Sequence, residues 1–215
     1  MLATKQQVES LIKLFKSGTK LTYKKGEQII RPGEQPSGVF YIDEGLVKAY
    51  DISKYGEENL LIIRRSHDIF PLIWAITGEE RDINYEALEP TTVWRISRKV
   101  YQDYLYSPDN NLAPILDMVV ENYRIHSERL LNLEYRSVRE RVISFLITMA
   151  KHFGEETPEG IQITAPLRHQ DIASSINSSR ETASREMAYL ERKGLIRNNQ
   201  SKVLLLDIEK LKSHL

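Results

Sequence analysis

The segment from 178 to 193 carries the side chains best suited to chemistry with a polar partner. It reads Ser-Ser-Arg-Glu-Thr-Ala-Ser-Arg-Glu-Met-Ala-Tyr-Leu-Glu-Arg-Lys, and Gly194 follows it. The two opening serines are good N-caps and a glycine suits a helix end, so the pattern predicts a helix. Its apolar stripe is Ala183, Met187 and Leu190, which leaves another face free to meet a polar partner. The segment therefore resembles a recognition helix.

The flanking residues must position this helix. A shorter helix is predicted from Arg168 to Ile176, and Asn177 between the two tolerates the left-handed backbone of a tight turn. After the second helix, two short apolar runs flank a polar turn, with Lys202 at its tip. Together these elements predict a winged helix-turn-helix, which places its second helix in the major groove of DNA. The alternative is that the charges only form a solvated helix face.

The composition limits the remaining function classes. Lys and Arg balance Asp and Glu at 30 each, but residues 135–215 hold 13 basic against 10 acidic side chains. That mild excess agrees with DNA binding in the C-terminal part.

The absence of cysteine excludes disulfides and cysteine-held iron–sulfur clusters or zinc. No apolar run is long enough for a membrane span and no signal peptide is visible, so we expect a cytoplasmic protein with no membrane partner.

Enzymatic function is not expected from the motifs. The sequence has no G-x-S-x-G, P-loop or H-E-x-x-H segment. A cupin-type oxygenase would need clustered histidines and a carboxylate. The five histidines are instead scattered along the chain, and only His67 lies in the β-rich part. We therefore expect no enzyme and no metal site. Haem is not expected either, because the chain has no cysteine and His126 falls in a helix seam, where a histidine is more often a hydrogen-bonded residue than a haem ligand.

The N-terminal half is rich in short β-runs. An amphipathic helix is predicted for residues 5–16, and from about 19 to 100 strand-like runs alternate with glycine turns. Regular spacing of this kind predicts an antiparallel sandwich or barrel.

A long helix should follow, opened by Ser107 as N-cap and Pro108 at its first position. It carries a heptad seam, which favours a homodimeric coiled coil. The alternative is that the helix only packs on its own sandwich. The seam residues are Leu112, Leu116, Val119, Tyr123, His126, Leu130 and Leu133. A further helix is predicted from Ser137 to about His152, followed by a polar loop from 154 to 160.

This order of elements resembles the cyclic-AMP receptor protein and fumarate–nitrate regulator (Crp/Fnr) superfamily of bacterial transcription factors, over nearly the whole chain. The strongest matches are Ser179-Arg180-Glu181-Thr182 with Arg185, Pro-Gly-Glu at 32–34, Tyr41-Ile42 followed by Glu44-Gly45, and Tyr55-Gly56-Glu57. The resemblance implies an α+β chain with three parts. These are a cyclic-nucleotide-binding-type β-roll (a double-stranded β-helix or jelly roll) at 1–106, a long dimerisation helix at 107–134, and a winged helix-turn-helix at 135–215.

The resemblance also implies the DNA contacts. The expected base readers are Arg180, Glu181, Ser184 and Arg185. The arginines match guanine readers and Glu181 matches a carboxylate that accepts from cytosine, in half-sites resembling TGTGA. Expected phosphate contacts are Gln170, Ser179, Thr182 and Lys202. Glu186 departs from the family pattern, where an apolar residue is usual. RNA polymerase is an expected partner, with the loop at 154–160 in the place of a polymerase-contacting surface.

The sensor half departs further. Where cyclic-nucleotide binders have Phe-Gly-Glu, this chain has Phe70-Pro71-Leu72, which lacks a backbone donor and a ribose acceptor. Asp82 follows the one matching arginine and would repel a phosphate. Cyclic AMP is therefore not the expected effector, and another small molecule is. The equivalent pocket would be lined by Phe70, Leu72, Trp74, Arg81, Asp82, His126 and Ser127.

Two alternatives stay open from the sequence. Leu72 and Trp74 could simply fill the core, with no effector bound. The chain could also be a small-molecule-binding module that acts on a protein partner, although such a module would not need a winged helix-turn-helix.

Overall fold

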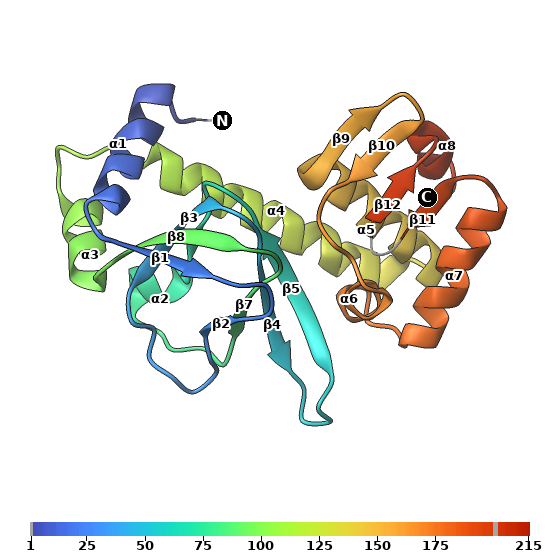
Figure 1. Cartoon of the computed structure of the whole chain (residues 1–215), viewed down its shortest axis with the longest axis horizontal. Helices are drawn as coiled ribbons and strands as arrows, with labels where there is room; N and C mark the ends of the chain where they lie inside the picture. The colour runs from blue at the N-terminus through green and yellow to red at the C-terminus, as the bar shows by residue number, and fades with distance from the viewer. Residues whose placement is uncertain (1, 200–201) are drawn as a thin grey trace. The chain divides into compact units, whose positions relative to one another are not determined.

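The computed structural model describes residues 2–199 and 202–215. The chain divides into two compact units (Figure 1). The first comprises Met1–Asp51 with Leu61–Arg124, and the second comprises Ile52–Leu60 with Ile125–Leu215. Helices and antiparallel sheets are both present, which confirms the predicted α+β class.

The β-roll consists of two four-stranded sheets. One has the order β1-β8-β3-β6 and the other β2-β7-β4-β5. The register aligns Ile42 with Val93 in the first sheet and Ala49 with Tyr85 in the second. The strands are β1 (Thr19–Tyr23), β2 (Gln28–Ile30), β3 (Val39–Glu44), β4 (Val47–Ile52), β5 (Glu58–Arg64), β6 (Ile69–Phe70), β7 (Asn84–Ala87) and β8 (Thr91–Ile96). These strands confirm the strand-like runs that the sequence predicts from about 19 to 100.

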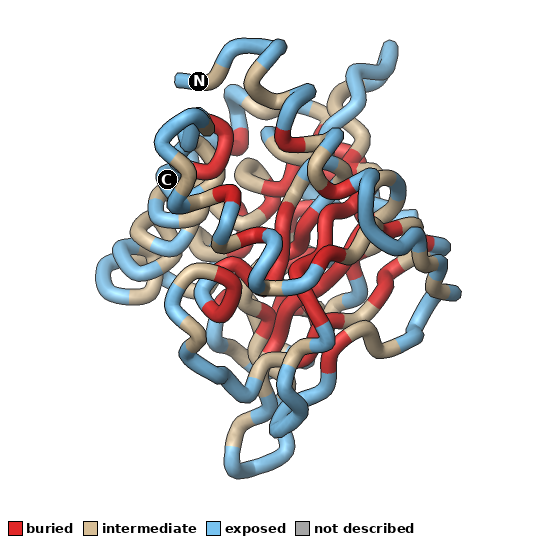
Figure 2. The backbone as a smooth tube through the Cα atoms, turned by 90° about the vertical axis from the view of Figure 1, so that its left-hand side faces the viewer, coloured by how far each residue is buried: buried red, intermediate tan, exposed pale blue. Residues whose placement is uncertain are grey.

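Two apolar clusters hold the first unit together. One joins both sheets through Phe40, Val47, Phe70 and Tyr85. In the other, helix α1 (Lys5–Lys16), as predicted, buries Leu11 and Phe15 together with residues of α2 (Leu72–Thr77) and α3 (Arg98–Tyr106). Figure 2 shows buried stretches of the backbone toward the middle of the view and exposed stretches at its rim. The sequence did not predict α2 or α3.

The long helix begins later than predicted. α4 spans Ala113–Tyr135, whereas Ser107 is the C-cap of α3 and does not open a helix. The loop between them is held by side chains: Asn110 Nδ2 donates to the Tyr104 carbonyl, and Asn111 Oδ1 accepts from the Ala113 amide at 2.8 Å. The expected N-cap at Ser107 and the placement of Leu112 within the helix are therefore wrong. These loop contacts outweigh the local Ser-Pro preference.

The second unit contains the helix-turn-helix and a four-stranded sheet in the order β11-β12-β10-β9. Its elements are α5 (Val138–Phe153), β9 (Gly154–Thr157), β10 (Gly160–Ile163), α6 (His169–Ser175), α7 (Arg180–Arg192), β11 (Ile196–Asn199), β12 (Lys202–Leu205) and α8 (Ile208–Lys212). The segment predicted as a polar loop, 154–160, instead forms β9 and the turn into β10. Cross-strand pairing of the backbone, invisible in its polar sequence, makes the difference.

Candidate nucleic-acid interface

The turn between α6 and α7 has the geometry that the sequence predicts. Asn177 adopts a left-handed backbone with φ of 51°. The next residue, Ser178, donates its amide to the Ala173 carbonyl at 3.0 Å. From α5, Arg141 donates to the Ile176 carbonyl at 2.9 Å. The turn is therefore fixed by its own backbone and by a neighbouring helix.

Local capping and burial orient α7. The Ser179 side chain accepts from the Thr182 amide at 3.2 Å and caps the first turn. Ala183, Met187 and Leu190 are almost fully buried, which seats this stripe in the core of the second unit. The opposite face of the helix is thereby directed outward.

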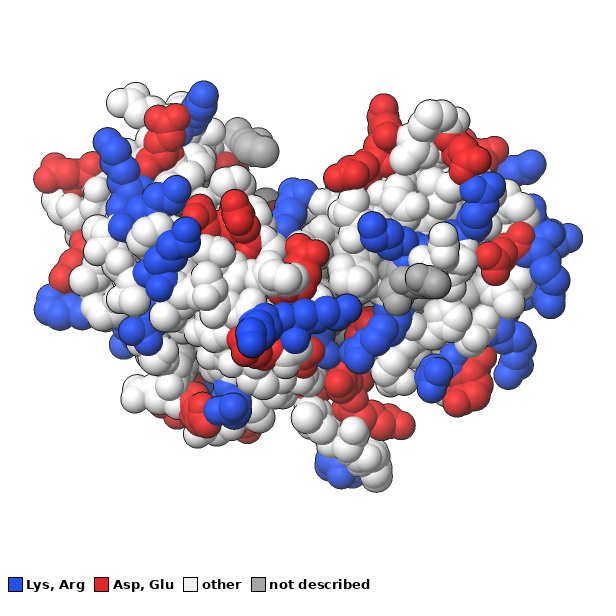
Figure 3. Space-filling view, in the orientation of Figure 1, with Lys and Arg blue, Asp and Glu red and all other residues white. Residues whose placement is uncertain are grey.

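The four predicted base readers lie on or beside that outward face. Arg180, Glu181 and Arg185 are exposed and Ser184 is half-buried. Within residues 2–199 and 202–215, neither Arg180 nor Arg185 has a hydrogen-bond or ion-pair partner in the chain. Figure 3 shows basic side chains along the edge of the molecule where α7 lies in Figure 1. Both guanidinium groups are thus available for an external acceptor.

Glu181 is held at the start of α7. Its own backbone amide and the Ser179 hydroxyl hydrogen-bond the carboxylate and lower its pKa from 4.5, and Arg180 adds to this effect. The side chain is therefore ionised at neutral pH and can act only as an acceptor. An acceptor at this position is the chemistry that a cytosine amino group requires.

The predicted phosphate contacts are placed less uniformly. The Ser179 and Thr182 hydroxyls hydrogen-bond each other at 3.0 Å, so both belong to the helix cap. Gln170 is half-buried at the start of α6, and Lys202 is exposed at the start of β12. Residues 200 and 201 of the wing turn lie outside the described residues.

Two contacts that support the winged helix-turn-helix were not predicted. Glu186 Oε2 accepts from Arg139 Nε of α5 at 2.6 Å, and the Arg139 guanidinium lies 3.7 Å from the centre of the Tyr189 ring. The polar residue at 186 thus has a partner on α5. His169 Nε2 also lies 2.9 Å from Asn198 Nδ2 and links α6 to the wing. The only sequence signal for the first contact was the charged residue at 186, where the family usually has an apolar residue.

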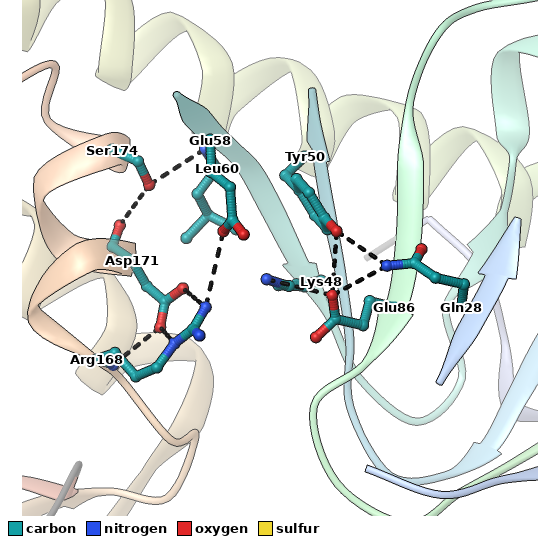
Figure 4. A network of polar contacts seen from close by, with 9 residues as sticks. All are labelled: Gln28, Lys48, Tyr50, Glu58, Leu60, Glu86, Arg168, Asp171 and Ser174. Carbon is teal, nitrogen blue, oxygen red and sulfur yellow. Dashed lines mark hydrogen bonds and ion pairs between the residues drawn. The ribbon is translucent and has the colours of Figure 1, made fainter. Parts of the chain in front are cut away.

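The segment 52–60 contacts the helix-turn-helix within the second unit. Arg168 lies between Asp171 and Glu58, with nitrogen–oxygen distances of 2.9 and 3.7 Å (Figure 4). The Leu60 amide donates to Ser174 Oγ of α6 at 3.3 Å. From α4, Arg129 donates to the Leu60 carbonyl at 2.7 Å. The hairpin between β4 and β5 is therefore bonded to the element that precedes the recognition helix.

Two family models match separate parts of the chain. The cyclic nucleotide-binding domain matches residues 20–106, and the Crp-like helix-turn-helix domain matches residues 140–214. The chain belongs to the Crp/Fnr superfamily of transcription regulators. It is a DNA-binding regulator of that type, and its relatives are transcription regulators rather than enzymes.

The relatives of this Crp/Fnr protein match over most of its length. It is 27% identical over 184 residues to the global nitrogen regulator of Synechocystis sp., covering 85% of this chain and 82% of that protein. It is 24% identical to the CRP-like cAMP-activated global transcriptional regulator of Mycobacterium tuberculosis, covering 88% and 84%. The crystal structure of a CRP-family regulator from Thermus thermophilus superposes with a TM-score of 0.75 at 23% identity, covering 90% of this chain and 95% of that one.

Most of the predicted seam of this Crp/Fnr regulator is exposed in the single chain. Leu116, Val119, Tyr123, His126 and Leu130 are exposed, and Leu133 is half-buried. Tyr123 is 74% exposed and Leu130 is 66% exposed. No helix within the described ranges is long and apolar enough to cross a membrane.

The predicted effector residues have different environments. Phe70 stacks between Phe40 and Tyr85, with ring centres 5.2 and 5.0 Å away. Leu72 and Trp74 belong to the core cluster around α2. This burial favours the alternative that they fill the core. Arg81 and Asp82 are exposed, and His126 and Ser127 lie in the part of α4 that belongs to the second unit.

Proposed function

We propose that this Crp/Fnr regulator acts as a homodimer that reads a palindromic site with half-sites resembling TGTGA. The observation that carries the proposal is the pair of exposed, unpartnered guanidinium groups of Arg180 and Arg185 on α7. A guanidinium can donate two hydrogen bonds to the O6 and N7 acceptors of guanine. Glu181 supplies the acceptor that cytosine needs, since its lowered pKa keeps it ionised.

Dimerisation is supported by the exposed seam of α4. Large apolar side chains at heptad spacing are unfavourably exposed to water in the single chain. Burying them against the same helix of a second copy is favourable. A two-fold dimer would place two α7 helices about 34 Å apart, the spacing of one turn of DNA. The palindrome follows from the two-fold axis.

Control by an effector other than cyclic AMP is part of the same proposal. Pro71 precedes α2 at its N-cap and has no amide hydrogen to donate, and Leu72 is buried in the core. An effector in the β-roll would change the angle of the paired α4 helices and so the spacing of the α7 helices. RNA polymerase is the expected partner at the promoter.

The test is selection of bound sequences from random duplex DNA by the full chain, with and without cell extract. The expected result is a two-fold symmetric motif related to TGTGA, enriched more strongly in one condition. Enrichment of an asymmetric motif, or of none in either condition, would count against the proposal.

A further inference from the structure

Helix α5 holds the helix-turn-helix at two separate points, each through an arginine. Arg141 donates to the Ile176 carbonyl, in the turn before α7, at 2.9 Å. Arg139 Nε donates to Glu186 Oε2, in the middle of α7, at 2.6 Å. Two fixed points define the direction of a rod. Helix α5 is therefore placed to set the orientation of α7.

The contact at Glu186 is more than one hydrogen bond. The Arg139 guanidinium also lies 3.7 Å from the centre of the Tyr189 ring, one turn further along α7. The Glu186 side chain is only 17% exposed, and its hydrogen bond raises the pKa of Arg139. A charge-assisted hydrogen bond and a cation over a ring each have a preferred geometry. Together they restrict the rotation of α7 about its own axis.

The apolar side of α7 does not impose this restriction. Ala183, Met187 and Leu190 seat the helix in the core, but hydrophobic contact has no preferred direction. A helix with its side chains is about 10–12 Å wide, so a roll of about 20° moves a side-chain tip by roughly 2 Å. Such a shift exceeds the tolerance of a hydrogen bond and would break a guanine contact of Arg185. Arg185 directly precedes Glu186 in the chain, so the contact that holds Glu186 also places Arg185.

We propose that Arg139 and Glu186 are positioning residues for sequence-specific DNA reading. Their ion pair sets the rotation of α7 and thereby aligns Arg180 and Arg185 with the edges of the bases. This inference rests on the proposed function and names the contact through which α7 keeps its specificity. The test separates this role from two others: a phosphate contact made by Arg139, and an ion pair that only stabilises the fold.

The experiment measures the ratio of the affinities of the full-length chain for a specific duplex and for random duplexes of the same length. The specific duplex is the sequence that the wild type selects from random DNA. The variants are Arg139→Gln, Glu186→Gln, both together, and the exchanged pair Arg139→Glu with Glu186→Arg. Arg192→Gln is the matched control, because Arg192 is an exposed cation in the last turn of the same helix. The unfolding midpoint and the salt dependence of binding are measured for each protein.

Arg139→Gln and Glu186→Gln should each lower the affinity ratio by about tenfold, because a misaligned arginine loses its paired hydrogen bonds to guanine. The double glutamine variant should lose no more than either single variant, since all three remove the same contact. The exchanged pair should have a higher ratio than either single variant. Arg192→Gln should keep the wild-type ratio.

Two results would overturn the positioning role. Equal losses on specific and random DNA for Arg139→Gln, with a smaller salt slope, would make this arginine a phosphate contact. Lower unfolding midpoints with an unchanged affinity ratio would leave the pair a stabilising contact only. A wild type that selects no sequence would refute the proposed function and this inference with it, whereas a wild-type preference that every variant keeps refutes the inference alone.

Discussion

Single side chains on α7 and β12 separate DNA specificity from DNA affinity. Arg185 is exposed and has no partner within the described chain, so the fold does not need it. Arg185→Ala should cost about 1–3 kcal/mol on the specific site and relax the choice at one guanine. Lys202→Ala should weaken binding to all sequences alike and lower the salt slope by about 1. Binding titrations on specific and random duplexes at several salt concentrations measure both.

The comparison of the two variants is the control. Equal losses on specific and random DNA for Arg185→Ala would show that this arginine contacts only the backbone of the duplex. A sequence-dependent loss for Lys202→Ala would remove it from the phosphate contacts.

Asn177 is a residue whose backbone conformation matters more than its contacts. It is exposed, and its φ of 51° lies in the region that β-branched residues avoid. Asn177→Val should lower the free energy of unfolding by about 1–2 kcal/mol, the cost of a left-handed backbone with a bulky Cβ. Asn177→Gly should lose less, because glycine adopts this region freely. Urea denaturation compares them, and equal losses would contradict the backbone explanation.

At the scale of elements, α5 begins with a charged capping box. The Ser137 amide donates to Glu140 Oε2 at 2.7 Å, and the Ser137 side chain accepts from the Glu140 amide. The Ser137 hydroxyl and amide lower the pKa of Glu140 from its ordinary 4.5. Because the pKa is lower in the folded protein, the ionised carboxylate stabilises the fold above pH 4.5, and this contribution is lost as the pH falls through the folded value.

Glu140→Gln tests this pH dependence. Glutamine can keep the capping hydrogen bond but has no charge, so the variant should be less stable than the wild type at pH 7. The difference between the two proteins should shrink as the pH falls below 4.5. Chemical denaturation at pH 7 and at pH 3.5 measures it, and a difference that does not change between the two pH values would rule out the ionised cap.

The hairpin from 52 to 60 shows how elements distant in sequence become one unit. Glu58 and Leu60 contact Arg168 and Ser174 of the helix-turn-helix, and Arg129 of α4 contacts both segments. Part of the β-rich sequence therefore belongs to the DNA-binding unit. Strand β5 is therefore joined to α6 by a direct hydrogen bond.

At the scale of the whole molecule, assembly should depend on the seam of α4. Leu130 is 66% exposed in the single chain, so Leu130→Lys should leave the fold intact while placing a charge in the dimer interface. The dimer should dissociate at least about tenfold more readily, since a desolvated, unpaired charge opposes association. Sedimentation velocity over a range of concentrations measures this.

Leu131 provides the matched control for the seam. It is 56% exposed on the same helix but lies beside the heptad positions. Leu131→Lys should therefore leave the dimer unchanged. Equal dissociation of both variants, or of neither, would contradict the predicted register.

The local features of this chain were predictable from sequence because they depend on neighbouring residues. The N-cap at Ser179, the left-handed Asn177 and the buried stripe of α7 each follow from side-chain type and spacing within one or two turns. The same local reasoning failed at Ser107, where Tyr104, Asn110 and Asn111 hold a loop in place of a helix start. It also failed at 154–160, where strand pairing overrides a polar sequence.

The helix-turn-helix was predictable from the sequence because helix periodicity and capping depend on neighbouring residues, and the family was inferred from the resemblance of its motifs. The interior of the β-roll depends instead on contacts between strands that are distant in the sequence. Arg64 stands at the end of an apolar strand, and nothing near it in sequence says whether a carboxylate will meet it. That depends on which strands pair and which side chains they bring together, and these contacts leave Arg64 buried, with no hydrogen-bond partner for its Nε among the described residues.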